Sequence, residues 1–189
     1  SYAQLGSLAQ NAIQRKKDED GLAVLDGATT QLNTAGSALA SGFIAAAVYQ
    51  ISSNATEPGN PPYRAVFHGF QLKDIWDELT AAVDTANRAD ISGITARVFQ
   101  EGLRGKIAGC EIYEDGNLTI SGTDAKGGVF AQEAIVLVQG RSPRTATVRR
   151  EDIGGGATVM YLYDEYAYGE RSAGNWLFEV IADATAPTS

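Results

Sequence analysis

The spacing of apolar residues changes near the middle of the chain, and this change limits the folds that the chain can adopt. Up to about residue 84, apolar residues recur three and four positions apart, which is typical of amphipathic helices. Beyond residue 90 they form short runs rich in Val, Ile, Tyr and Phe, separated by turn signals such as Asp115-Gly116-Asn117. Helices followed by strands, without regular alternation, predict an α+β fold with a mainly antiparallel sheet.

The first predicted helix covers residues 3–17. Its apolar residues fall on a single stripe, which we expect to face the core: Leu5, Leu8, Ala9, Ala12 and Ile13. Three acidic residues follow, Asp18 to Asp20. Because acids lie badly against the negative end of a helix, we expect them beyond it, and Gly21 is able to stop the helix.

Further helices and strands are predicted along the rest of the chain. The helices cover residues 38–52, with Ser37 as the N-terminal cap, and about 71–84. Runs of strand-forming residues occur at 65–67, 106–113, 134–138, 145–149, 158–166 and 177–182. We expect loops at 22–36 and 53–62, a flexible break at Gly154 to Gly156, and a hairpin-like turn over 168–175 that joins the last two strands.

Composition restricts the kind of protein and its partners. The 189 residues suffice for one domain or for two small lobes. The formal charge is 15 − 23 = −8 and the pI is about 4.6, which argues against nucleic acid as the main direct partner. No run approaches the roughly 18 apolar residues of a membrane-spanning helix. The single cysteine, Cys110, excludes an internal disulfide and a cysteine-based zinc site.

Few residues suggest catalysis or ligand binding. His68 is the one histidine, so any Ser-His-Asp or Cys-His unit would have to use it, but no G-x-S-x-G motif accompanies it. We interpret His68 as a structural residue at a strand end and Cys110 as a small core residue. The acidic residues form adjacent pairs and runs typical of solvated faces, and no phosphate-binding glycine loop occurs. We therefore predict no catalytic residue, no cofactor and no metal site.

A cluster of arginines is the most unusual charge feature: Arg141, Arg144, Arg149 and Arg150. From residue 151 to residue 189 the chain then has seven acidic residues and one basic residue. Opposite charges in separate blocks suit head-to-tail contacts between copies of one chain. The alternative is that the two blocks pair within one fold or face water, and charge alone leaves both open.

Several short segments resemble, in order along the chain, the major capsid proteins of tailed phages. Residues 103–113, Leu-Arg-Gly-Lys-Ile-Ala-Gly-Cys-Glu-Ile-Tyr, are similar to that family's G-x-I-A-G-x-x-I-Y strand. Arg64 to His68 is similar to a strand of the family that ends in His-Pro, with Gly69 in place of the proline. The further similar segments are Gly128 to Ala134, Arg150-Glu151-Asp152, Tyr168-Gly169 and Ile181 to Thr185.

This resemblance implies the Hong Kong phage capsid fold, an α+β fold with a peripheral lobe, built from a spine helix and an antiparallel sheet, and an axial α/β lobe. It implies that residues 1–29 and 134–189 form the peripheral lobe, with the helix at 3–17 as all or part of the spine. Residues 30–133 would form the axial lobe. In the family an N-terminal arm and an extended hairpin loop precede the spine helix, and nothing here precedes residue 3, so we expect a portion of a longer subunit.

The function that the resemblance implies is structural. The chain would self-associate into hexamers and pentamers of a viral capsid that encloses double-stranded DNA. Scaffolding and portal proteins would be further partners, contact with DNA would be indirect, and no membrane would be involved. The protein would belong to the virion and assemble in the host cytoplasm, with the arginine cluster at a subunit contact. The alternatives are an encapsulin-like bacterial shell, a hydrolase built around His68, and a monomeric binding module.

Overall fold

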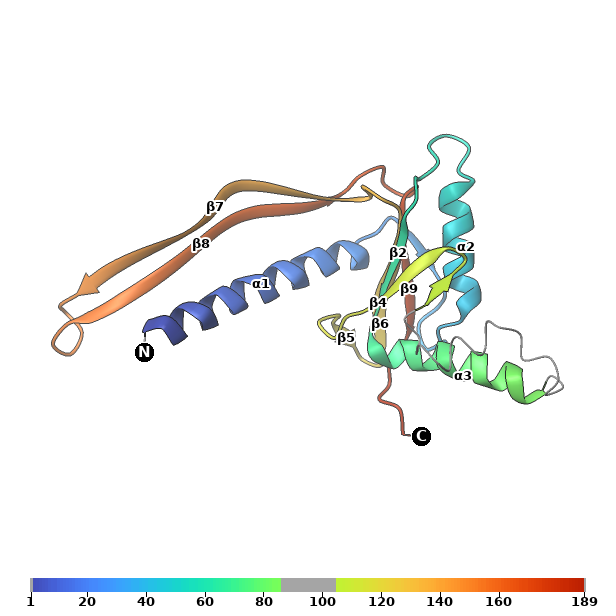
Figure 1. The fold of residues 1–189 in the computed structure, drawn as a ribbon, viewed down its shortest axis with the longest axis horizontal. Coiled ribbons are helices and arrows are strands. Elements are labelled where there is room, and N and C mark those ends of the chain that lie inside the picture. Colours follow the sequence, from blue (N-terminus) through green and yellow to red (C-terminus); the bar gives the residue numbers. More distant parts are fainter. Residues whose placement is uncertain (1, 86–104, 189) are drawn as a thin grey trace.

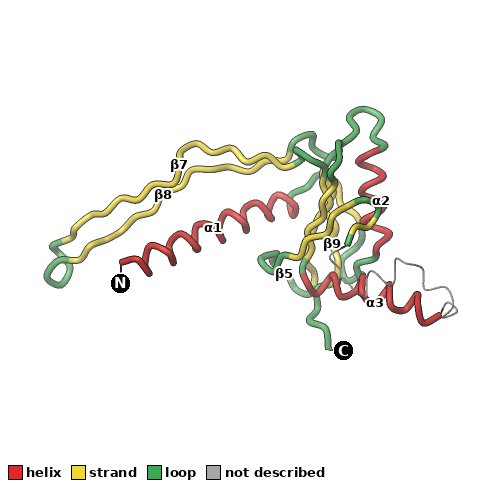
Figure 2. Tube along the Cα trace, in the orientation of Figure 1, coloured by secondary structure: helices red, strands yellow, loops and turns green. Residues whose placement is uncertain are grey.

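The computed structural model describes residues 2–85 and 105–188 (Figures 1 and 2). The helices are α1 (Tyr2–Asp26), α2 (Ser41–Ser52) and α3 (Gly69–Thr85). The strands are β1 (Thr30–Leu32), β2 (Tyr63–Phe67), β3 (Lys106–Ile107), β4 (Cys110–Glu114), β5 (Ile120–Ser121), β6 (Asp124–Phe130), β7 (Ile135–Arg150), β8 (Ala157–Glu170) and β9 (Leu177–Asp183). They form a seven-stranded sheet and a separate two-stranded ribbon, so the predicted α+β class is confirmed.

The seven-stranded sheet is mixed but mainly antiparallel. Its strand order is β1-β9-β6-β2-β4-β3, with β5 paired to β6. β1 runs parallel to β9 and β2 runs parallel to β4, whereas the other pairs are antiparallel. The single strand predicted over 106–113 is wrong. It is a hairpin of β3 and β4, because Ala108 and Gly109 take φ angles of 50° and 80° and reverse the chain.

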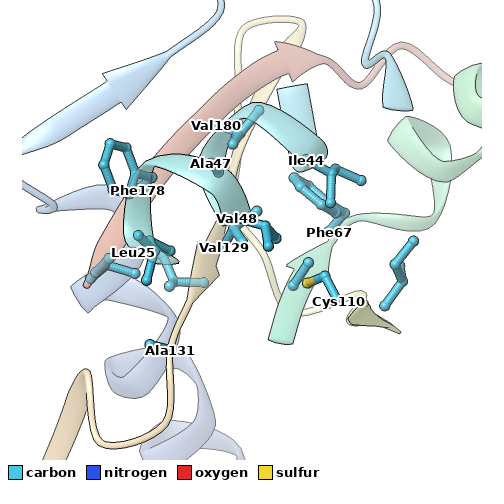
Figure 3. Packing of buried hydrophobic residues seen from close by; sticks show 14 of the residues in the cluster. Leu25, Ile44, Ala47, Val48, Phe67, Cys110, Val129, Ala131, Phe178 and Val180 are labelled. Carbon is cyan, nitrogen blue, oxygen red and sulfur yellow. The ribbon is translucent and has the colours of Figure 1, made fainter. Parts of the chain in front are cut away.

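Helix α2 packs on this sheet and supplies much of the hydrophobic core (Figure 3). Ile44 and Val48 of α2 are buried in one cluster with Phe67 of β2, Val129 of β6 and Val180 of β9. The predicted helix 38–52 is thus present, but it begins three residues later than expected. These side chains come from strands far apart in the sequence, so the core closes only when the long-range strand pairing is complete.

The cap of α2 differs from the prediction. Ala40 precedes the helix and makes no side-chain cap, and Ser37 lies in the preceding loop. The Glu78 carboxylate of α3 accepts hydrogen bonds from the Ser41 amide at 2.8 Å and from the Ser41 hydroxyl at 2.9 Å. A negative charge at a helix N-terminus is favourable, so Glu78 of α3 caps α2 in place of the predicted cap Ser37.

Helix α1 is longer than predicted and continues through Asp18 to Asp20 and Gly21. Two of the acids pair one turn back: Lys16 Nζ lies 2.7 Å from Asp20 Oδ1, and Arg15 Nε lies 3.0 Å from Glu19 Oε1. The third, Asp18, accepts a hydrogen bond of 2.6 Å from Asn117 Nδ2. Gly21 does not end the helix. A Cβ there would lie 3.4 Å from the ring of Tyr168, so the ring of β8 packs directly on this position of α1.

The N-terminal half of α1 does not bury the predicted apolar stripe. Ala9 and Ile13 are half-buried, whereas Leu5 is 58% exposed and Leu8 is 65% exposed. Ala12 is exposed on the same side of the helix. We call Leu5, Leu8 and Ala12 the leucine stripe, and no described part of the chain covers it.

The ribbon is formed by β7 and β8, two antiparallel strands of 16 and 14 residues. The strands predicted at 134–138 and 145–149 are one strand, because register shifts between Gln139 and Arg141 and between Arg141 and Arg144 let the pairing continue past Pro143. Gly154 to Gly156, all with positive φ, lie in the turn at the tip. The hairpin predicted over 168–175 is wrong, because β9 pairs with β6 and β1 rather than with β8.

The two sheets therefore divide the C-terminal segment 134–189. β7 and β8 form the ribbon beside α1, whereas β9 lies within the seven-stranded sheet together with strands of segment 30–133 (Figure 1). The names peripheral lobe and axial lobe, and the boundaries given to them from the sequence, stay predictions.

Candidate interaction surface

The ribbon projects from the seven-stranded body, and α1 runs along one of its faces (Figures 1 and 2). Strand alternation gives β8 two faces. One face, formed by Met160, Leu162, Asp164, Tyr166 and Tyr168, lies toward α1. On it, Asp164 contacts Lys17, Tyr166 contacts Asp20, and the ring of Tyr168 packs on Gly21. The opposite face is left without a partner among the described residues.

Three contacts hold the ribbon on α1. Lys17 Nζ lies 2.6 Å from Asp164 Oδ2, and the Asp164 side chain is only 4% exposed. The Tyr166 hydroxyl donates a hydrogen bond of 2.8 Å to Asp20 Oδ2, and the ring of Tyr168 packs against Gly21. Burial, followed by the hydrogen bond to Asp20, raises the pKa of Tyr166 to about 12. We call these contacts the ribbon anchor.

Toward the N-terminus of α1 the ribbon and the helix separate. A cavity of about 440 Å³ lies between them, and its walls include Gly6 and Ile13 of α1 and Met160 and Leu162 of β8. The ribbon anchor therefore fixes one portion of the ribbon on α1, while the portion nearer the tip makes looser contacts.

The base of the ribbon is joined to the body by a second set of contacts. Arg171 follows β8 and its guanidinium lies 2.7 Å from Glu133 Oε2, while its amide donates to the Ala134 carbonyl. The guanidinium also lies 5.4 Å from the centre of the Trp176 ring. These contacts connect the entry and exit of the ribbon, so β7 and β8 leave the body together.

The four predicted contact arginines all lie on β7, and the structure does not bring them into one pocket. Arg141 Nε is 3.3 Å from Glu165, Arg149 Nε is 2.8 Å from Glu151, and Arg150 is 2.7 Å from Asp152. Arg144 stacks over the ring of Tyr163, with 5.2 Å between the guanidinium and the ring centre. Exposed pairs of this kind contribute about 0–1 kcal/mol each to folding.

Sequence analysis missed the apolar character of the ribbon face that points away from α1. We define the outer face as the exposed apolar residues on this side, with exposed fractions from 38% to 60%: Val136, Val138, Val148, Tyr161 and Tyr163. Tyr161 and Tyr163 stack with their ring centres 6.2 Å apart. The alternation of the β8 sequence contained this signal, but strand pairing was needed to combine it with β7.

His68 and Cys110 occupy structural positions. The Phe70 amide donates a hydrogen bond of 3.2 Å to His68 Nδ1, and the His68 amide donates to Gln71 Oε1, so His68 organises the first turn of α3. Within the described ranges His68 forms no ion pair with a carboxylate. Cys110 is fully buried, and this burial, with a smaller effect of Glu111, raises the pKa of its thiol to about 12. Neither arrangement supports the hydrolase alternative.

Residues 2–85 and 105–188 show no metal site and no membrane-spanning helix. These residues hold no group of three or more His, Cys, Asp or Glu side chains that could bind a metal ion. None of the described helices is both long and apolar enough to span a bilayer. The outer face and the leucine stripe are exposed apolar surfaces among these residues, and such surfaces suit contacts with another macromolecule.

Comparison with known proteins identifies relatives of the fold. No protein-family model matches the sequence, and no curated protein matches it in sequence. A chain from the capsid of the cyanophage P-SCSP1u superposes with a TM-score of 0.67 at 16% identity, over 98% of this chain and 67% of that chain. A chain from the head of Helicobacter pylori bacteriophage KHP40 gives a TM-score of 0.64 at 13% identity, over 93% of this chain and 66% of that chain.

An encapsulin chain is similar to a comparable degree. The holo-SrpI encapsulin complex from Synechococcus elongatus PCC 7942 gives a TM-score of 0.64 at 8% identity, over 100% of this chain and 68% of that chain. The present chain spans about two thirds of the length of these solved chains. At such low identities the likeness concerns the fold and not the function. The chain has the Hong Kong phage capsid fold, as the resemblance of its short motifs implied.

Proposed function

We propose that this chain is part of the structural subunit of a viral capsid. The observation that carries this proposal is the fold: nearly the whole chain superposes on chains of two phage particles. The outer face supports it, because monomeric proteins rarely leave a long aligned set of apolar side chains uncovered. A subunit of this kind needs no catalytic group.

In this proposal the subunits associate into hexamers and pentamers that close around double-stranded DNA. Assembly takes place in the host cytoplasm with scaffolding and portal proteins, and the product is the virion. The net charge of −8 suits a protein that encloses DNA without binding it tightly. Stability of the shell comes from many modest contacts repeated by symmetry.

The arginine cluster is proposed as one of these subunit contacts, against acidic residues of a neighbour. Arg144 is the best placed, because its described partner within the chain is the Tyr163 ring rather than a carboxylate. Arg149 and Arg150 lie next to the tip and pair with Glu151 and Asp152. Because these exposed pairs contribute little to folding, both arginines can leave them to pair with acids of a neighbour at a small cost in free energy. Replacing both with Glu should weaken assembly of the complete gene product, and normal particle yield would contradict this contact.

The proposed function is tested by the size of the particles that the complete gene product forms. Light scattering and negative-stain microscopy should show closed shells, whereas a stable monomer would overturn the proposal. An encapsulin-like shell is the second candidate, because the SrpI encapsulin chain is covered as completely as the phage chains. The contents of the particles distinguish the two: packaged DNA supports the capsid, and enclosed protein cargo supports the encapsulin-like shell.

A further inference from the structure

We propose that Glu179 of β9 is a proton-dependent clamp on the C-terminal end of α1, which holds the helix on the sheet more tightly when its carboxyl group is neutral than when it is ionised. This inference goes beyond the proposed function, because it concerns a single chain and requires no shell. It rests on the burial of Glu179 and on its two charged neighbours, Lys126 of β6 and Asp26 of α1.

Glu179 lies on the face of the seven-stranded sheet that the end of α1 covers. Its register partner on β6 is Gly128, and the next pair on the same face is Ile181 with Lys126. Leu25, in the last turn of α1, packs on this face, since a Cβ at Gly128 would lie 3.0 Å from Leu25 Cδ2. The Glu179 side chain therefore points to the side of the sheet on which the helix ends.

The Glu179 carboxyl group is buried with little compensation. Its side chain is 4% exposed, and Lys126 Nζ lies 3.5 Å from its Oε1, longer than the roughly 2.7–2.9 Å of a charge-assisted hydrogen bond. Among residues 2–85 and 105–188, Oε1 has no hydrogen-bond donor. Burial raises the pKa of Glu179 above its ordinary value, Lys126 lowers it by less, and Asp26 raises it a little further. The folded chain therefore favours the neutral carboxyl group.

Lys126 is shared between Glu179 and the end of α1. Its Nζ lies 2.5 Å from Asp26 Oδ1, so the ammonium is nearer to the helix than to β9. Lys126 and Asp26 are the charged side chains that act on Glu179 from β6 and α1, and Gln31, its register partner on β1, is uncharged. Asp26 is also the last residue of α1, where the helix carries its negative end.

The charge of Glu179 therefore acts on the attachment of α1. An ionised Glu179 competes with Asp26 for Lys126, and it repels both the Asp26 carboxylate and the negative end of the helix. A neutral Glu179 leaves Lys126 to Asp26, and that pair ties α1 to β6. Because the ribbon is held on α1 by the ribbon anchor, a looser end of α1 also loosens the support of the ribbon.

The direction of the pH dependence follows from the raised pKa. The contribution of Glu179 to stability is complete below its ordinary pKa of 4.5 and is lost as the pH rises through the higher pKa of the folded chain. One proton is involved, so opening of the α1 end should become up to about tenfold easier per pH unit between these two values. Mild acid should therefore tighten α1 on the sheet.

Hydrogen exchange at pH values from 5 to 8 tests the clamp in the complete gene product. Glu179→Gln is permanently neutral, and comparison at the same pH removes the intrinsic pH dependence of amide exchange. Residues 20–26 of the unchanged protein should exchange as in the variant at pH 5 and at least about tenfold faster than in the variant at pH 8. Residues 41–52 of α2 should exchange equally in both proteins.

Glu111→Gln is the matched control on the same sheet. Hydrogen bonds from Lys106 and then Tyr113 lower the pKa of Glu111, so its contribution to stability is lost as the pH falls, the opposite sign to Glu179. This variant should keep the loosening of residues 20–26 at pH 8. Loss of the loosening in Glu111→Gln would mean that it does not come from Glu179 and would overturn the clamp.

A second variant tests the role of Lys126. Lys126→Met removes the cation beside Glu179, so the exchange of residues 20–26, corrected for the intrinsic rate, should begin to rise at a higher pH than in the unchanged protein. An onset at the same pH would overturn the clamp. So would equal exchange of the unchanged protein and Glu179→Gln at every pH, or a difference that grows equally in α1 and α2. Particle size, which tests the proposed function, is measured separately and does not depend on these outcomes.

Discussion

The seven-stranded body and the ribbon of this chain bury very different shares of their side chains. In the body, Phe67 of β2, Val129 of β6 and most of β9 are buried, whereas no residue of β7 is fully buried. A two-stranded ribbon alone is marginally stable in water. The body thus holds itself together, while the ribbon depends on α1 on one face and leaves the other face available. The difference separates the folding part of the molecule from the part available for contacts.

Removal of a core side chain from the body has the largest expected effect. Phe67→Ala empties a fully buried position in the sheet and should lower the free energy of unfolding by about 3–5 kcal/mol. Val138→Ala, at a ribbon position that is 60% exposed, should change the free energy of unfolding by less than about 0.5 kcal/mol. Urea unfolding followed by the fluorescence of the two tryptophans, Trp76 of α3 and Trp176 before β9, measures both. Equal losses would show that body and ribbon share one core.

Local pattern predicted most elements of both regions but not their ends or partners. Short runs of β-branched and aromatic residues predicted strands where β2, β4, β7, β8 and β9 lie, because those residues suit a pleated surface, whereas β1, β5 and β6 were not predicted. Around Gly21, α1 is held by the contact of Lys17 with Asp164 and by the Tyr168 ring, and both partners come from β8, more than 140 residues away. Such contacts leave no mark in the local sequence of the helix.

The candidate surface could be predicted only in part for a similar reason. Composition alone drew attention to the arginines, because clustered charge is visible without a fold. The outer face needs the pairing of β7 with β8, and that register shifts twice between Gln139 and Arg144. A register one residue different would turn every side chain to the other side. The exposure of Leu5 and Leu8 likewise follows from where the ribbon lies, not from the helical period.

Disruption of the ribbon anchor should loosen the ribbon without unfolding the body. Lys17→Met leaves the nearly buried Asp164 carboxylate unpaired and should cost about 1–3 kcal/mol, less than a fully buried pair because Lys17 is itself 22% exposed. Hydrogen exchange should quicken in β7 and β8 and stay unchanged in β6 and β9. Arg15→Met breaks the exposed pair with Glu19 and is the matched control, with an expected cost of about 0.3–0.5 kcal/mol. Faster exchange in the body would contradict an independent ribbon.

Alkaline titration examines the same anchor at Tyr166. Its pKa is raised from 10.0 to about 12, so the folded chain favours the neutral phenol. Its contribution to stability is complete below pH 10 and is lost as the pH rises through about 12. Ultraviolet absorbance of tyrosinate should show a late-titrating component that is missing in Tyr166→Phe. An unchanged titration curve in Tyr166→Phe would mean that the anchor does not protect this hydroxyl.

The smallest expected effect concerns the exposed ion pairs of the ribbon. Arg141→Ala removes a 3.3 Å pair with Glu165 in which both side chains are more than half exposed, so the free energy of unfolding of this chain should change by less than about 0.5 kcal/mol. The same substitution in the complete gene product separates folding from assembly. Unchanged stability with reduced particle yield would place the role of Arg141 between copies, where neighbours exclude water and strengthen the pair. A stability loss above 1 kcal/mol, measured by urea unfolding, would instead mean that the ribbon relies on this pair.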